Sequence, residues 1–165
     1  MLFRSLVVHG AAGRMGQRIV ACAAADTVPW KLVAAIERAG HPKIGVDAGV
    51  LAGIGEAAVA ISPSWSCPAD VVIDFSLPEA VAGIVAACEK ARVPLVVATT
   101  GLDEAARGAI ARAAKTIAVL QSPSMSLAVN IAMDLVGRAG GLLKRLGSRA
   151  DVEIVECHQI GRAHV

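Results

Sequence analysis

Aromatic side chains are scarce in this chain, and tyrosine is absent. They make up 2% of the 165 residues, and the formal net charge is only +2. No run of basic residues is interleaved with aromatic ones, so we expect no nucleic-acid partner. No apolar run reaches the ~18–20 residues that span a bilayer, so we expect no membrane partner either.

Cysteines are also few, and none shows a metal or disulfide spacing. The four cysteines form no C-x-x-C pair, which predicts neither a zinc site nor a disulfide. Cys22 and Cys88 lie among alanines on predicted helices, where we expect small buried core residues. Residues 1–4 lack the apolar core of a secretory signal. We therefore expect a cytoplasmic location, a small-molecule partner and no metal.

Hydrophobic residues are plentiful at 55%, and their first run ends at a glycine-rich turn. Ser5–His9 reads as a strand, and the residues after Gly13 read as a helix. In such a junction Gly10 permits a tight turn, Gly13 lets the backbone approach a pyrophosphate, and Gly16 lets the helix pack closely on the strand. The candidate phosphate-binding residues are Gly10, Ala11, Ala12, Gly13, Arg14, Met15 and Gly16. The anion would bind N–H groups at the helix N-terminus.

An acidic residue follows at the distance typical of dinucleotide-binding units. A second apolar run, residues 32–36, ends at Glu37, which lies 21 positions after Gly16; about 20 are expected for the ribose-binding acid. Glu37 favours the free 2′-hydroxyl of NAD, whereas the adjacent Arg38 can pair with the 2′-phosphate of NADP. Arg14 is a second candidate for phosphate contact. The alternative for the turn and Glu37 is a simple glycine turn followed by a surface charge. The alternative for Arg14 is a solvated arginine on the helix surface.

Strands and helices alternate through the next part of the chain. After a predicted loop at 39–49 come strands at 59–61, 70–75, 94–98 and 117–120, and helices at 78–91 and 103–115. This rhythm predicts an α/β fold, a Rossmann-type doubly wound parallel sheet with helices on both faces. Ligands bind at the carboxyl ends of such strands.

The last part of the chain has a different pattern. A helix is expected at 127–146, and residues 151–158 then alternate polar and apolar, as in a half-exposed strand of another sheet. We expect a dinucleotide-binding domain at 1–121 and, at 122–159, the first helix and strand of a second, incomplete α+β domain, which are too few to bury a core of their own.

Several motifs together resemble the 4-hydroxy-tetrahydrodipicolinate reductase family of lysine and diaminopimelate biosynthesis. They occur in the family's order at residues 10–16, 37–38, 74–79, 98–101, 122–130 and 152–158. The resemblance implies an NAD(P)H-dependent oxidoreductase that uses NADPH or NADH to reduce a cyclic imine diacid with loss of water. It also implies a homotetrameric parent enzyme.

The resemblance assigns roles to individual residues. It places Glu37 and Arg38 at the ribose and 2′-phosphate, and His158 as the proton donor; the alternative for His158 is a polar residue that ends a strand. Further cofactor-binding positions implied by the resemblance are Phe75, Ala98, Thr99, Thr100, Ser122 and Met125.

The chain also departs from the family pattern. Ser124 stands where the family has asparagine, and the lysine and P-S-G-T run that hold the substrate are absent after His158. Residues 160–165 match the translation of a common short-read sequencing adapter, whose first bases would complete the codon of Gln159. We therefore expect 160–165 to be a non-native tail, and the fragment to be inactive and not tetrameric.

Two other functions fit the same first domain. One is a different Rossmann NAD(P)-dependent oxidoreductase, and the other is a non-enzymatic dinucleotide-sensing module. The oxidoreductase would lack the family's continuation after residue 158, and the sensing module would end after the first domain.

Overall fold

A computed structural model describes residues 4–25, 29–148, 151 and 153. The chain divides into two compact units, Met1–Ser124 and Met125–Val165. Each unit is described by itself below.

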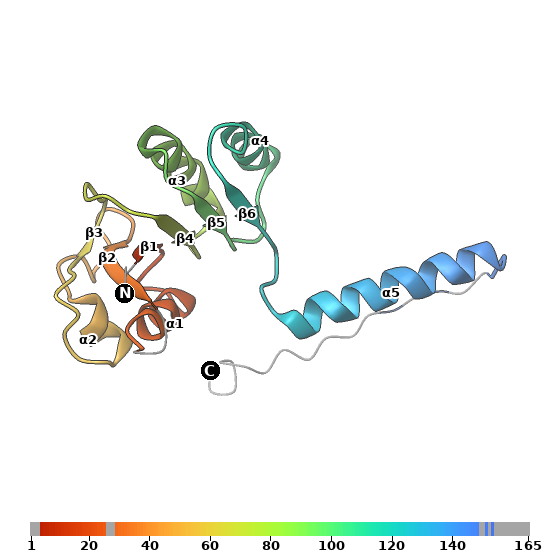
Figure 1. Ribbon diagram of the computed structural model, residues 1–165, viewed down its shortest axis with the longest axis horizontal. Coiled ribbons are helices and arrows are strands. Elements are labelled where there is room, and N and C mark those ends of the chain that lie inside the picture. Colours follow the sequence, from red (N-terminus) through yellow and green to blue (C-terminus); the bar gives the residue numbers. More distant parts are fainter. Residues whose placement is uncertain (1–3, 26–28, 149–150, 152, 154–165) are drawn as a thin grey trace. The chain divides into compact units, whose positions relative to one another are not determined.

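The first unit is built on one six-stranded sheet in which every neighbouring pair of strands is parallel. The strand order is β3-β2-β1-β4-β5-β6 (Figure 1). The strands are β1 (Arg4–His9), β2 (Trp30–Ile36), β3 (Ile61–Ser62), β4 (Val71–Asp74), β5 (Leu95–Val97) and β6 (Val119–Gln121). This order reverses between β1 and β4, so the predicted doubly wound parallel sheet is confirmed.

Helices cover both faces of this sheet (Figure 1). Four helices belong to the unit: α1 (Arg14–Ala23), α2 (Ala48–Ala52), α3 (Pro78–Ala91) and α4 (Glu104–Ala113). Val7 faces α3 and α4, while its neighbour Val8 faces α1 and α2, because successive side chains of a strand point to opposite faces. The apolar core therefore lies in two layers, one on each side of the sheet.

The two helical cysteines differ in their burial. Cys88 is fully buried, as expected, and burial raises the pKa of its thiol to about 12. Cys22 is exposed, so the expectation that it fills the core was wrong. The buried stripe of α1 passes through Gly16, Val20 and Ala23, and position 22 lies beside this stripe.

The segment between β2 and β3 contains a short helix, α2, which begins at Ala48 near the end of the loop predicted at 39–49 and was not itself predicted. Asp47 caps α2 by accepting hydrogen bonds from the backbone N–H groups of Gly49 and Val50 at 2.8 and 3.0 Å. The same carboxylate accepts from the N–H groups of Ala57 and Val59. These bonds hold the pKa of Asp47 below its usual value. One side chain, rather than a hydrophobic period, therefore forms this helix.

Other element boundaries shift by a few residues. Helix α4 ends at Ala113 rather than at Lys115, and β6 covers Val119–Gln121 rather than 117–120. The N–H of Ile117 still donates to the carbonyl of Ala113, so residue 117 belongs to the helix end and not to the sheet.

The second unit contributes helix α5, Leu127–Arg145, which Ser126 caps through the N–H of Val129. None of its 19 residues is buried. An ion pair of 2.9 Å joins Asp134 to Arg138 one turn away. The predicted strand at 151–158 and the tail at 160–165 lie outside the described residues, apart from Asp151 and Glu153. Within the described ranges, no helix is long and apolar enough to cross a membrane.

Replacement of Gly16 by alanine should destabilise the first unit. A Cβ at this position would overlap the carbonyl oxygen of Gly10 and lie 2.7 Å from the Cα of Ala11, so backbone must move. We expect a loss of about 1–3 kcal/mol in the free energy of unfolding, measured by urea denaturation.

The matched control is Gly83→Ala in α3, where a Cβ meets nothing within 4 Å. Helix propensity should make this variant about 0.5–1 kcal/mol more stable. If both variants gained stability, the close approach at Gly16 would be contradicted.

Candidate functional site

The glycine-rich turn between β1 and α1 lies against the end of β4. Gly10 has φ +76°, and a Cβ there would lie 2.6 Å from the carbonyl oxygen of Phe75. On its other side the turn contacts α1 at Gly16. Two steric contacts therefore bring the start of a helix to the point where the strand order reverses.

Hydrogen bonds within this turn determine which N–H groups face outward. The N–H groups of Gly10 and Ala11 both donate to the carbonyl of Ile36, at 2.9 and 3.0 Å, and that of Gly13 donates to Gly10. The first helical bond of α1 runs from the N–H of Gln17 to Gly13. The N–H groups of the helix's first turn therefore precede any helical acceptor, which is the arrangement that binds anions.

The remaining predicted residues of the turn have different exposures. Ala11 is buried at 2% exposure and Ala12 is half-buried. Arg14 and Met15, in the first turn of α1, are exposed.

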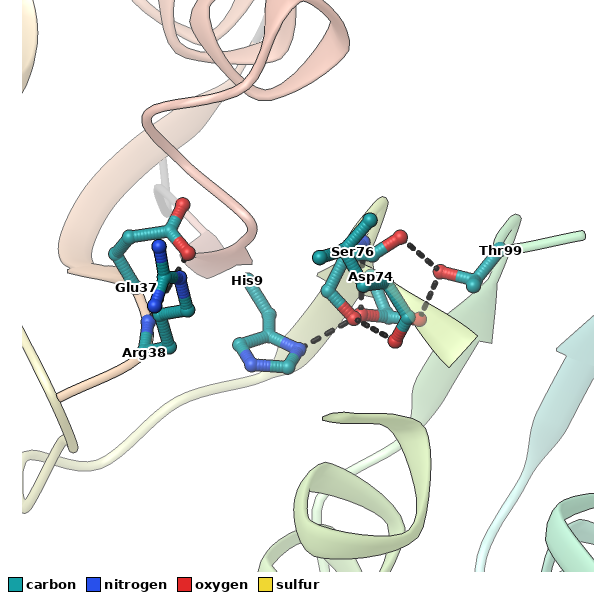
Figure 2. Close-up of polar contacts among 7 residues, drawn as sticks. His9, Glu37, Arg38, Asp74, Ser76 and Thr99 are labelled. Atoms are coloured by element: carbon teal, nitrogen blue, oxygen red, sulfur yellow. Dashed lines mark hydrogen bonds and ion pairs between the residues drawn. The ribbon is translucent and has the colours of Figure 1, made fainter. Parts of the chain in front are cut away.

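Glu37 and Arg38 directly follow β2, next to the turn (Figure 2). The carboxylate of Glu37 accepts a hydrogen bond from the N–H of Arg38 at 3.0 Å, and the Arg38 side chain is exposed. The backbone N–H of Glu37 donates to Ser62 at the end of β3. An acidic side chain, Glu37, and a basic one, Arg38, thus lie next to each other at the carboxyl edge of the sheet.

A buried polar network joins the ends of β1, β4 and β5 (Figure 2). The Nδ1 of His9 lies 2.7 Å from one carboxylate oxygen of Asp74, and Thr99 Oγ1 donates to the other at 2.7 Å. The N–H of Ser76 also donates to Asp74. Asp74 is 0% exposed and His9 is 8% exposed. The network therefore lies at the edge of the core, at the carboxyl ends of β1, β4 and β5.

The Asp74 carboxylate is ionised in this setting. Burial raises its pKa, but the hydrogen bonds from His9, Ser76 and Thr99 outweigh burial and lower the pKa below its usual value. An ionised carboxylate only accepts hydrogen bonds, so Nδ1 of His9 carries a proton. Sequence reasoning singled out neither His9 nor Asp74. The available signal was a polar residue at the end of each of two apolar strands.

The predicted nicotinamide-side residues lie at neighbouring strand ends. Phe75 donates its N–H to His9, and Ala98 donates to Asp74. Thr99 is buried at 7%, whereas Thr100 is exposed. Ser122 donates its N–H to Val97. Backbone bonds thus connect the loops after β1, β4, β5 and β6.

Two predicted residues do not belong to the described part of the first unit. Met125 opens the second unit, and its side chain is 44% exposed. His158 lies outside the described residues. Within the part that the structure describes, no group of three or more His, Cys, Asp or Glu side chains is arranged to hold a metal ion.

An apolar groove of about 660 Å³ opens beside the network, between α3 and the segment that follows β3. Its walls include Ile36, Trp65, Ala80 and Ile84, and His9 lies in its lining. Ile36 is the last residue of β2 and immediately precedes Glu37, so this wall of the groove lies next to the acid and the arginine.

Replacement of Asp74 by asparagine should destabilise the chain by about 1.5–3 kcal/mol at neutral pH, because the hydrogen bonds from His9, Ser76 and Thr99 lose their charged acceptor. The native pKa of Asp74 is lowered, so its stabilisation is present above the unfolded value of about 3.9. It is lost as pH falls through the lower native pKa. The difference between the two proteins, measured by urea denaturation, should therefore shrink below about pH 4.

Asp103→Asn is the control, because asparagine caps a helix as well as aspartate does and Asp103 caps α4. This variant should have nearly wild-type stability. A stability difference for Asp74→Asn that stayed constant down to pH 2 would exclude the proposed role of its charge.

Comparison with known proteins gives matches over most of the chain. The family model described as "Dihydrodipicolinate reductase, N-terminus" matches residues 4–125. The 4-hydroxy-tetrahydrodipicolinate reductase of Rhodopirellula baltica is 46% identical over 159 residues, which is 93% of this chain and 56% of that protein. That of Anaeromyxobacter dehalogenans strain 2CP-1 is 45% identical over 156 residues, with the same coverage. The chain thus spans about half the length of these relatives.

Solved structures support the fold. A dipicolinate-bound dihydrodipicolinate reductase from Paenisporosarcina sp. TG-14 has a TM-score of 0.50 and 17% identity, over 74% of this chain and 48% of that one. A myo-inositol 2-dehydrogenase from Lactobacillus plantarum has a TM-score of 0.59 and 14% identity, over 84% and 42%. Because the family model covers most of the sequence, this chain belongs to the dihydrodipicolinate reductase family.

Proposed function

We propose that this chain is the dinucleotide-binding part of an NAD(P)H-dependent 4-hydroxy-tetrahydrodipicolinate reductase of lysine and diaminopimelate biosynthesis. The observation that carries the proposal is the helix N-terminus held open by Gly10 and Gly16 beside Glu37 and Arg38. Those features supply an anion site and a ribose-binding acid at the strand-order reversal. The reaction is the one for which these relatives are named.

In this proposal the cofactor lies across the carboxyl edge of the sheet. The pyrophosphate takes the N-terminus of α1, the adenosine ribose meets Glu37, and a 2′-phosphate pairs with Arg38. The adenine enters the groove that Ile36 lines. The nicotinamide ring lies over the ends of β4 and β5, and its proposed contacts are Phe75, Ala98, Thr99 and Thr100. Ser122 and Met125 are proposed as further cofactor-binding residues.

The proposed reaction needs the rest of the enzyme. The bound cofactor supplies a hydride to the ring of the cyclic imine diacid, and His158 is proposed to supply the proton as water leaves. We assign residues 1–121 to the dinucleotide-binding domain and 122–159 to the start of the substrate domain. A homotetramer is proposed for the whole enzyme.

Arg38→Ala should weaken NADPH binding about tenfold or more and leave NADH binding nearly unchanged. The reason is the charge-assisted hydrogen bond between a guanidinium and a 2′-phosphate, which NADH lacks. Isothermal titration of both cofactors measures the two dissociation constants.

Arg107→Ala on α4 is the matched control, since Arg107 is an exposed arginine on a helix distant in sequence from the turn. Its affinities should match the wild type. Equal losses for NADPH and NADH in Arg38→Ala would show that Arg38 is only a surface charge.

A chimera tests the reaction itself. Residues 1–158 joined to the unmatched C-terminal part of the Rhodopirellula baltica relative should oxidise NADPH in the presence of 4-hydroxy-tetrahydrodipicolinate. His158→Ala in the chimera should lower turnover about 10²–10⁴-fold while NADPH still binds. A folded chimera that bound NADPH without turnover would contradict the assigned reaction.

A further inference from the structure

His9 has two ring nitrogens in different surroundings. Nδ1 donates to Asp74 at 2.7 Å, and Asp74 is itself held by Thr99 and Ser76. Among the described residues, Asp74 is the one side-chain partner of the imidazole. The ring is 10% exposed and lies in the lining of the groove. Its second nitrogen, Nε2, has no hydrogen-bond partner among the described residues, and it lies on a largely buried side chain beside a ligand-sized space from which solvent or a ligand can reach it.

Asp74 fixes the hydrogen-bonding character of that second nitrogen. An ionised carboxylate accepts and cannot donate, so the proton of a neutral imidazole stays on Nδ1. Nε2 then presents a lone pair, and a ligand group must donate a hydrogen bond to satisfy it. A carbonyl oxygen in the same place would leave two acceptors facing each other.

The sheet register places this acceptor beside the proposed ribose site. His9 in β1 pairs with Ile36 in β2 on one side and with Asp74 in β4 on the other. Ile36 immediately precedes Glu37, and Ile36 and His9 both line the groove, so a base attached to a ribose at Glu37 would enter the groove on the side of the His9 ring. The walls formed by Ile36, Ala80 and Ile84 are apolar and accept any flat purine.

We propose that Nε2 of His9 accepts a hydrogen bond from the exocyclic amine of the cofactor's adenine, which makes His9 a specificity residue for adenine dinucleotides. This inference rests on the dinucleotide binding proposed above. Apolar contacts hold the purine, and His9 distinguishes a 6-amino group from a 6-oxo group. A ligand without the amine leaves a buried acceptor unpaired, which lowers affinity.

The test compares NADH with reduced nicotinamide hypoxanthine dinucleotide, in which oxygen replaces the 6-amino group. Fluorescence titration of the reduced nicotinamide gives both dissociation constants. The wild-type chain should bind NADH about tenfold or more tightly than the hypoxanthine analogue. Imidazole ¹⁵N NMR provides a second measurement, because the Nε2 signal of His9 should shift with NADH and not with the analogue.

His9→Asn separates recognition from support of the core. The asparagine amide can occupy the position of Nδ1 and still donate to Asp74, but it has no atom in the position of Nε2. The preference for NADH should fall to within twofold, with both ligands still bound. His41→Asn is the matched control, because His41 lies in the loop after β2 outside the groove lining; its preference should equal the wild type.

The outcomes distinguish this inference from the proposed function. Equal wild-type affinities for the two dinucleotides would overturn the role of His9 and leave dinucleotide binding intact. An unchanged preference in folded His9→Asn would also overturn it. If His9→Asn did not fold, the wild-type ratio and the NMR shift would still decide. Failure of a folded wild-type chain to bind either ligand would contradict the proposed function and this inference with it.

Discussion

The carboxylate of Asp74 is the interaction on which the site depends. It accepts hydrogen bonds from groups that follow or end three neighbouring strands: the His9 ring, the Ser76 N–H and the Thr99 hydroxyl. Loops at strand ends have few apolar contacts to hold them, so their positions must come from polar bonds. A single buried charge therefore fixes the relative positions of the loops on both sides of the strand-order reversal. Because this carboxylate is buried, a substitution that removes one of its hydrogen-bond partners should destabilise the arrangement.

Close steric contact complements that charge at the same carboxyl end of the sheet. Gly10 approaches Phe75 on one side and Gly16 on the other, and no Cβ fits at either glycine. The carbonyl of Ile36 occupies the N–H groups of Gly10 and Ala11, so the turn directs the later N–H groups outward. The anion site and the polar network thus both lie where the β1–α1 turn meets the end of β4. The same residue, Ile36, borders the turn, the network and the groove.

Short-range patterns were sufficient to predict the fold and much of the site's location. Apolar runs separated by helical segments predicted the parallel sheet, and glycine spacing with Glu37 indicated one edge of it. The pairing of His9 with Asp74 was not predictable in this way, because the residues lie 65 positions apart and meet only through the β1–β4 pairing. Helix α2 was missed because one side chain, Asp47, forms it in a segment without hydrophobic period. The exposure of Cys22 follows from the rotation of α1: Gly16, Val20 and Ala23 form its buried stripe at helical spacing, and the expectation for Cys22 rested on its alanine neighbours instead of on this period.

The capping of α2 has a consequence for the motions of the segment between β2 and β3. Asp47 accepts from Gly49 and Val50 within the helix and from Ala57 and Val59 on the return segment. Because these four amides share one carboxylate, the departure of that side chain releases both halves of the segment together. Their amide hydrogens should then exchange with solvent as one cooperative unit, rather than fraying from one end of the helix.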